Sequence, residues 1–592
     1  MHSYIPSDES HENFYGEDEA MILVRIEDGD FEGEEMIIDV CDLEDIYSCQ
    51  ELIERLTSMR ACVHWEIEED RRNFLLEICP FISAWESRNL DLQTIFLKEE
   101  IELLLVDSLS CLRNRDRSSP GEVFIDFVTK TGYKDEPIIA EDGKILYHRT
   151  TPIHCAARSS CRFHIVEKLF AIYDNYQINY TDKTGLSHFQ VACKFGCYDV
   201  IYKFLELGQN PNCVWGETGD SSLHFALAPE NWSYNRTTRM LLERGTDPTL
   251  VNAQGVTILH LLCKREPDVR LVDLFLCICA ERNHFVQINA QDKFGNTPLH
   301  EALKYGQIKW IHYLLKRGAR PNLANENGFT PLHVICQRNE DDGLIEIFLK
   351  CCDNAKHTVN LNARDKEGRT PLEYAVARLL PRAVDVLLAK VANLSEFVFP
   401  TAAHFAEILS LGLLHDYHFK LRIAAGSLSI VEKLESRGFE LVRSDALATM
   451  ELFDKSKVLE KPKNLDERWY EHEKFVSRAK EVMIRKDFSL YDLVELRAKD
   501  AAYKLTPRSY YEEFVYQRKL NNIFRIHKEA CAIHLCVKLS RKFFHEWAQD
   551  PLWKLLHGKM PIECCDMVIE NLDNDDLHRI LLAPTAQSLK QR

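Results

Sequence analysis

The chain has 592 residues, of which 45% are hydrophobic and 28% charged, as is ordinary for folded globular protein. Its formal net charge is −19, and a net acidic chain lacks the basic surface that general nucleic-acid binding requires. Because no stretch approaches the roughly 18–20 apolar residues of a membrane span, and no P-loop, GxSxG, HExxH or protein-kinase signature occurs, we expect neither membrane insertion nor catalysis, and no cofactor.

An acidic segment comes first. Residues 1–50 hold sixteen acidic side chains and one basic one, Arg25. Such blocks repel themselves and stay solvated, so we expect residues 1–48 to form a disordered tail. The segment lacks the apolar core of a signal peptide, and none of the 20 cysteines lies in a CxxC pair. Both features favour reduced thiols without a metal in the cytoplasm, with the nucleus as an alternative.

Residues 49–140 read as a small helical domain followed by a connector. Leu52, Leu56 and Met59 have the spacing of one helix face, and Ile101, Leu104 and Leu105 have that of another. The residues after about 115 are charged and include several glycines, which is typical of a connecting segment.

Residues 141–440 contain an internal repeat. Strong copies start at Thr151, Thr257, Thr297 and Thr330, and weaker copies start at Ser187, Ser221 and Thr370. Successive copies lie 33 to 40 residues apart, the period of a solenoid built from helical hairpins. Thr or Ser opens every copy, where it can cap the helix that follows, and in six copies a Gly suited to a tight turn lies two residues earlier.

Five copies place a histidine at the fourth position. They are His154, His224, His260, His300 and His333. Recurrence at one structural position favours a structural role over a metal or catalytic one: the ring can bridge the capping hydroxyl and a neighbouring backbone group. A unit of turn, helix, helix and turn, with the same residues recurring at fixed positions, resembles an ankyrin repeat. The array of such units implies an all-α solenoid. From residue 395 to 440 the pattern weakens, and we interpret this stretch as one or two degenerate capping repeats.

The resemblance implies a protein partner, held by the concave face and the β-turn fingers. The candidate target-binding residues on the concave face are Arg158, Lys194, Lys264, Arg265, Lys304, Tyr305, Arg338 and Arg378. Those on the fingers are Trp215, Phe294 and Phe329, because aromatic residues are frequent binding hot spots. The basic residues would suit an acidic target. The alternatives are an ordinary solvated charged face, and aromatics that pack on the next finger.

The chain after residue 440 changes character. The charged residues 441–468 are expected to form a linker, and 469–592 to form a helical C-terminal domain. Near its end, Met560, Pro561, Ile562 and Glu563 start a predicted helix whose apolar residues include Ile569 and Leu572. An acidic turn and Leu577 then begin a second helix. Without further information this is a helical hairpin that finishes a domain.

This motif, in which a hydrophobic residue is followed by Pro, any residue and Glu ahead of an apolar helix, is also similar to the start of an F-box. After a repeat array, residues 558–583 resemble the F-box-like end of a PRANC domain, although Met560 replaces the usual Leu. The resemblance implies that Met560, Pro561, Ile562, Glu563, Ile569, Leu572 and Leu577 bind the Skp adaptor of a cullin–RING ubiquitin ligase. The chain would then be a substrate receptor. The alternative is a repeat scaffold, or an inhibitor that masks a signalling or transcription factor, without ligase recruitment.

Overall fold

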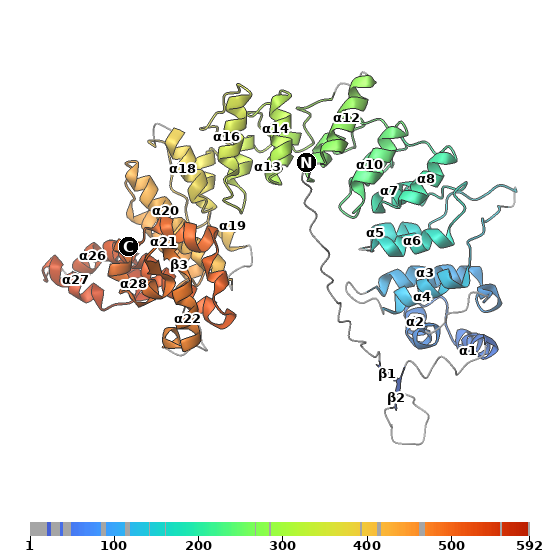
Figure 1. The fold of residues 1–592 in the computed structure, drawn as a ribbon, viewed down its shortest axis with the longest axis horizontal. Helices are drawn as coiled ribbons and strands as arrows, with labels where there is room; N and C mark the ends of the chain where they lie inside the picture. The colour runs from blue at the N-terminus through green and yellow to red at the C-terminus, as the bar shows by residue number, and fades with distance from the viewer. Residues whose placement is uncertain are drawn as a thin grey trace, which may run out of the picture. The chain divides into compact units, whose positions relative to one another are not determined.

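The computed structural model describes residues 21–24, 36–39, 49–83, 90–112, 119–140, 143–159, 161–266, 268–282, 286–390, 394–410, 416–460, 468–556 and 559–589. The described residues are helical apart from two short pairs of strands (Figure 1). They form two compact units. Unit 1 comprises residues 1–258 and 268–286, and unit 2 comprises residues 259–267 and 287–592. The division runs through the repeat that begins at Thr257.

Unit 1 begins with the acidic segment. Two antiparallel strands, β1 (Met21–Val24) and β2 (Met36–Asp39), lie within it. The rest of the predicted tail falls outside the described residues, so a disordered tail stays a prediction. The helical domain follows as α1 (Cys49–Ala61), α2 (Glu68–Ser83), η2 (Leu92–Thr94), α3 (Lys98–Ser110) and α4 (Pro120–Thr131). The predicted connector is thus partly helical, because Phe124, Phe127 and Val128 bury one face of α4.

The first repeats of unit 1 are helical hairpins, as the sequence predicts. Their helices are α5 (Pro152–Arg158) with α6 (Phe163–Ile172), α7 (His188–Phe195) with α8 (Tyr198–Glu206), and α9 (Ser222–Ala226) with α10 (Tyr234–Glu243). The helix α12 (Val269–Glu281) belongs to the same unit. First helices pack on first helices, since α5 contacts α7 and α7 contacts α9.

Unit 2 continues the pattern. Its repeat helices are α11 (Ile258–Cys263, from residue 259), α13 (Pro298–Lys304) with α14 (Ile308–Lys316), α15 (Pro331–Cys336) with α16 (Leu344–Asn354), and α17 (Pro371–Ala377) with α18 (Pro381–Lys390). The degenerate stretch holds α19 (Ala406–Leu409) and the longer α20 (Tyr417–Ser436). The backbone N–H of Thr401 still donates to His404 Nδ1 at 3.1 Å, so the cap of a repeat survives where Gly and Pro are lost.

The predicted linker 441–468 is shorter than expected. It contains a helix, α21 (Arg443–Lys455), whose Ala446, Met450 and Phe453 are almost fully buried. Because these three residues lie on one face of the helix, the segment can bury an apolar face although most of its other residues are polar or charged. Residues 461–467 lie outside the described residues.

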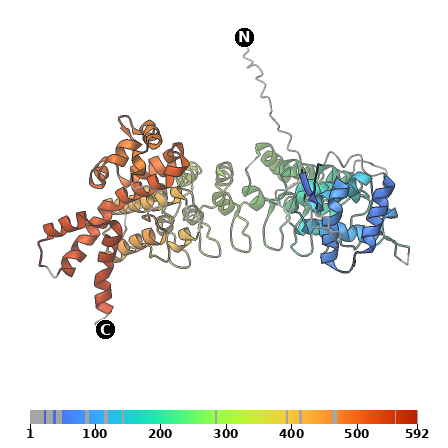
Figure 2. The same cartoon turned by 90° about the horizontal axis from the view of Figure 1, so that it is seen from below.

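The C-terminal module completes unit 2. Its elements are η3 (Trp469–Glu471), α22 (Glu473–Glu481), β3 (Met483–Arg485), β4 (Phe488–Ser489), α23 (Leu490–Glu495), α24 (Ala498–Lys504), α25 (Pro507–Tyr510), η4 (Tyr511–Tyr516), η5 (Lys519–Asn522), α26 (Arg525–Leu555), α27 (Ile562–Glu570) and α28 (Asn574–Leu589). The long α26 packs along α20, and Figure 2 shows these orange and red helices together. The module therefore adjoins the end of the repeats directly.

Candidate protein-binding groove

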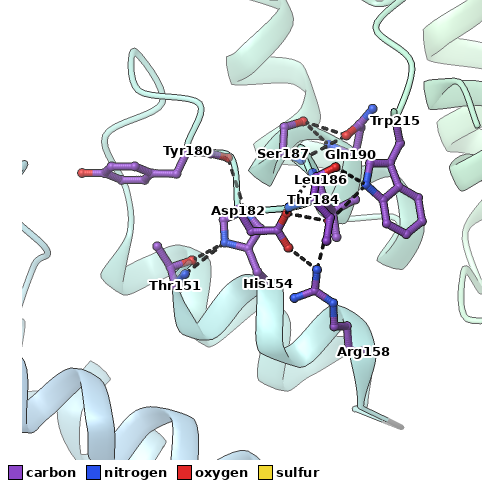
Figure 3. A network of polar contacts seen from close by, with 10 residues as sticks. All are labelled: Thr151, His154, Arg158, Tyr180, Asp182, Thr184, Leu186, Ser187, Gln190 and Trp215. Atoms are coloured by element: carbon purple, nitrogen blue, oxygen red, sulfur yellow. Dashed lines mark hydrogen bonds and ion pairs between the residues drawn. The ribbon is translucent and has the colours of Figure 1, made fainter. Parts of the chain in front are cut away.

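The capping histidines have a structural role, as predicted. In unit 1 the backbone N–H of Thr151 donates to His154 Nδ1 at 3.1 Å, and His154 Nε2 lies 3.3 Å from the carbonyl oxygen of Tyr180 in the next finger (Figure 3). In unit 2, His300 Nε2 likewise lies 3.0 Å from the carbonyl oxygen of Phe329. Each ring joins its own helix cap to the following repeat.

Burial keeps these rings neutral. It lowers the pKa of His154 and of His300 to about 4, against an ordinary value of 6.5. Where the sequence replaces histidine, the contact remains. The N–H of Ser187 donates to Gln190 Oε1 at 3.0 Å, and the N–H of Thr370 donates to Glu373 Oε2 at 2.8 Å. A hydrogen-bond acceptor is required at this position, and a metal ligand is not.

The basic residues of the concave face are mostly engaged within the protein. In unit 1, Arg158 pairs with the buried Asp182 and donates to Thr184 Oγ1 at 3.1 Å (Figure 3). Lys194 donates to the carbonyl oxygen of Ala157 at 2.6 Å and lies 3.4 Å from Glu230. These contacts join neighbouring repeats.

The same holds for three basic residues of unit 2. Arg338 donates to the carbonyl oxygen of Leu303 at 3.1 Å and pairs with Asp342 at 2.8 Å. Arg378 pairs with Glu407, and Lys264 Nζ lies 3.8 Å from Glu301. A cation that hydrogen-bonds the last carbonyls of a helix stabilises its negative end, as Arg338 does here. The contacts of Arg338, Arg378 and Lys264 thus join repeats. Arg265 is half-buried.

Lys304 differs from the rest of this set. Its side chain is exposed, and among the described residues it forms no ion pair. Its Nζ lies 5.8 Å from the ring centre of Tyr305, which is 48% exposed. A cation over an aromatic face is a weak contact at an exposed site, so Lys304 keeps its charge available.

A groove of about 630 Å³ crosses the first helices of unit 2. It brings together five of the predicted target-binding residues, which are Lys304, Tyr305, Phe329, Arg338 and Arg378. A second hollow of about 570 Å³ shares Arg378 and extends to Phe399 and His404. The two hollows form a surface of mixed charge rather than a uniformly basic one.

The aromatic residues predicted to bind from the fingers also differ in whether they pack within the protein or remain exposed. The indole N–H of Trp215 donates to the carbonyl oxygen of Thr184 at 3.1 Å (Figure 3), and Phe329 meets Tyr374 edge to face at 5.6 Å. Both therefore pack within the protein. Phe294 is 59% exposed. Sequence reasoning missed Trp232, which is 89% exposed; a tryptophan in a polar loop was the available signal.

The predicted Skp-binding residues do not share one surface. Ile569 and Leu577 are fully buried, Leu572 and Met560 are half-buried, and Pro561, Ile562 and Glu563 are exposed. The prediction that Ile569 and Leu577 bind a partner is therefore wrong. Both are core residues, because the predicted apolar stripe faces the module. The accessible apolar residues of α27 also include Met567 and Val568, at 60% and 38% exposure.

Repeated helical hairpins with a capped first helix, linked through His or its substitutes, define a helical repeat protein. The family model for ankyrin repeats, in three copies, matches residues 223–325 and 317–396. The chain therefore contains ankyrin repeats, and its described residues form an all-α repeat fold. Beyond the matched residues, the copies at Thr151 and Ser187 show the same caps.

Each relative matches only part of the chain. The chain is 32% identical to Alpha-latrotoxin-Lg1a of Latrodectus geometricus over 139 residues, which are 23% of this chain and 9% of that protein. It is 33% identical to Transient receptor potential cation channel subfamily A member 1 of Homo sapiens over 106 residues, 18% of this chain and 9% of that protein. It is 27% identical to Inversin of Canis lupus familiaris over 206 residues, 35% of this chain and 18% of that protein. The chain thus spans less than a fifth of each. Within the part that the structure describes, no helix is long and apolar enough to cross a membrane.

Proposed function

We propose that this protein is a non-enzymatic adaptor. The repeats of unit 2 bind a target protein in the groove, and the C-terminal helices recruit the Skp adaptor of a cullin–RING ubiquitin ligase. The observation that carries target binding is the groove of about 630 Å³, which has Lys304 and Tyr305 at its edge. An adaptor acts by raising the effective concentration of its target near the ligase.

Recruitment is supported by the surface of α27. Ile562 is 43% exposed beside Pro561 and Glu563, and Met567 and Val568 are further exposed apolar residues of the same helix. Exposed apolar residues that form a patch mark interaction sites. Ile569 and Leu577 hold the helical hairpin together from inside.

The test is recovery of a Skp adaptor with the full chain. Pro561→Ala combined with Ile562→Asp should abolish recovery, and Ile526→Asp should not. Ile526 is a matched control because it is 68% exposed on α26 of the same module. If the unaltered chain recovers no Skp adaptor, the recruitment part of the proposal fails.

A scaffold or inhibitor without ligase recruitment is the second candidate. It is favoured by the packing of α26 on α20, where Lys420 pairs with Glu529 at 3.0 Å. Here the module serves as a cap of the repeats. Target binding that survives Pro561→Ala with Ile562→Asp, in a chain that never recovers Skp, would select this candidate.

A further inference from the structure

Within the described residues, the cations at the groove of unit 2 differ in their partners. Arg338 pairs with Asp342 and Glu340, Arg378 pairs with Glu407, and Glu301 lies 3.8 Å from Lys264. Lys304 forms no ion pair there, although its ammonium group interacts electrostatically with Glu301. These four cations and four carboxylates balance in sum, and the positive charge that remains accessible to a partner is the exposed ammonium group of Lys304.

Lys304 and Tyr305 have a counterpart in the same repeat. Lys293 Nζ lies 5.0 Å from the ring centre of Phe294, and both side chains are exposed. One lysine–aromatic pair precedes α13 (Pro298–Lys304) and the other lies at its C-terminal end. The helix alone rises about 10 Å, which is the length of about three extended residues.

From these contacts we propose that the groove accepts an acidic target segment with apolar side chains next to its carboxylates. This rests on the proposed target binding and specifies its chemistry. A carboxylate of the segment pairs with Lys304, and a neighbouring apolar side chain packs on Tyr305. Lys293 and Phe294 repeat this recognition at the finger.

The polar lining of the groove agrees with an extended segment. Gln337 lines the groove, and within the described residues its side-chain amide makes no hydrogen bond. An amide can donate to and accept from a peptide backbone. The carboxylate of Glu301 would repel an acidic residue at the base of the groove. Its side chain is only 9% exposed, however, and Lys264 lies beside it. The acidic residue therefore binds at the rim, where Lys304 lies.

A basic segment fits less well. The exposed Lys304 repels it, and the carboxylates of Glu340, Asp342 and Glu407 already pair with arginines. A basic residue would have to share these carboxylates with the guanidinium groups. Complementary charge thus selects acidic partners and disfavours basic ones.

The experiment uses the folded full chain and an array of twelve-residue peptides. The peptides combine Leu or Phe with Asp and Glu, with Lys and Arg, or with Ser and Asn. Acidic–apolar peptides should bind best. For the strongest of them, Lys304→Glu should weaken affinity about tenfold, because an exposed attraction becomes a repulsion, and Lys304→Arg should retain it.

Lys350→Glu is the matched control, since Lys350 is exposed on α16 of the same unit. It should leave affinity unchanged, and an unchanged melting temperature should show that Lys304→Glu is folded. Preference for basic or neutral peptides, or an equal effect of both substitutions, overturns the inference while leaving target binding intact. If no class of peptide binds, the groove is not the target site and the proposed function fails with it.

Discussion

Two neighbouring repeats of unit 2 place a cation at or just beyond the end of the first helix, with different results. Arg338, in the repeat that starts at Thr330, bonds the carbonyl oxygen of Leu303 and two carboxylates. Lys304, in the repeat that starts at Thr297, bonds none among the described residues. A place near the end of the first helix therefore does not by itself separate a residue that joins repeats from one that can bind a partner.

The difference follows from residue type and local sequence. The planar guanidinium of Arg338 has several donors in fixed directions, and Glu340 and Asp342 follow it closely. Lys304 has a single ammonium group and is followed by Tyr305, Gly306 and Gln307. A cation becomes structural where acceptors surround it.

The loop after Arg338 has a second anchor. Asp341 accepts hydrogen bonds from the backbone N–H groups of Arg382 and Ala383 at 2.7 and 3.2 Å, and burial raises its pKa to about 6. Arg382 in turn pairs with Glu512 of the C-terminal module at 2.6 Å. Asp341 thus fixes the groove wall at Asn339 and Glu340 to the start of α18, and Arg382 fixes that end of α18 to the C-terminal module.

The largest expected effect comes from removing the cation that joins repeats. Arg338→Ala should lower the free energy of unfolding by about 2–3 kcal/mol, because a helix-end carbonyl and two carboxylates lose their partner. Lys304→Ala should cost less than about 0.5 kcal/mol. Urea denaturation of the full chain measures both. Equal shifts in the two variants would remove the distinction between these residues.

An intermediate effect concerns the capping histidines, which make the same contacts in the repeats that carry them. Since the pKa of folded His300 is about 4 and its ordinary value is 6.5, acid favours the unfolded chain. Its full contribution is present above pH 6.5 and declines as the pH falls toward 4. His300→Gln keeps an acceptor, as Gln190 does naturally, but cannot titrate.

The measurement is the change in stability between pH 7.5 and 5.5 for His300→Gln and for the unaltered chain. The variant should lose less, by on the order of 1 kcal/mol. His312→Gln is the control, because it changes a histidine on α14 that does not cap a helix. An identical acid loss in all three proteins would contradict the role of a buried neutral ring.

The smallest effect is expected at the anchor of the groove wall. Glu512→Gln should speed amide hydrogen exchange in residues 338–342 by about fivefold, because a half-buried ion pair of roughly 1 kcal/mol is weakened. Glu529→Gln, which changes the carboxylate that pairs with Lys420, should leave that segment unaltered. Exchange that is unaffected by Glu512→Gln would show that the module does not steady the groove.

The sequence predicts the repeats far better than it predicts their surface. Caps, turns and buried stripes are local, so residues such as Thr297 and His300 are recognisable from spacing. The partners of Lys194 and Arg338 are carbonyls more than 30 residues away, which no local pattern specifies. Near the C-terminus, periodicity predicts the apolar face of α27 but not what covers it; the F-box-like resemblance implies that Ile569 binds a partner, whereas its side chain is buried within the protein.

The most direct test of groove binding uses a photo-crosslinking amino acid at Tyr305, compared with Ile308. Both positions are 48% exposed, but Tyr305 lines the groove and Ile308 begins the second helix. The full chain carrying p-benzoylphenylalanine at either position is irradiated with the best acidic–apolar peptide from the array. We expect an adduct at position 305 and little at 308. Equal adducts, or adducts only at 308, would place the peptide elsewhere and contradict groove binding.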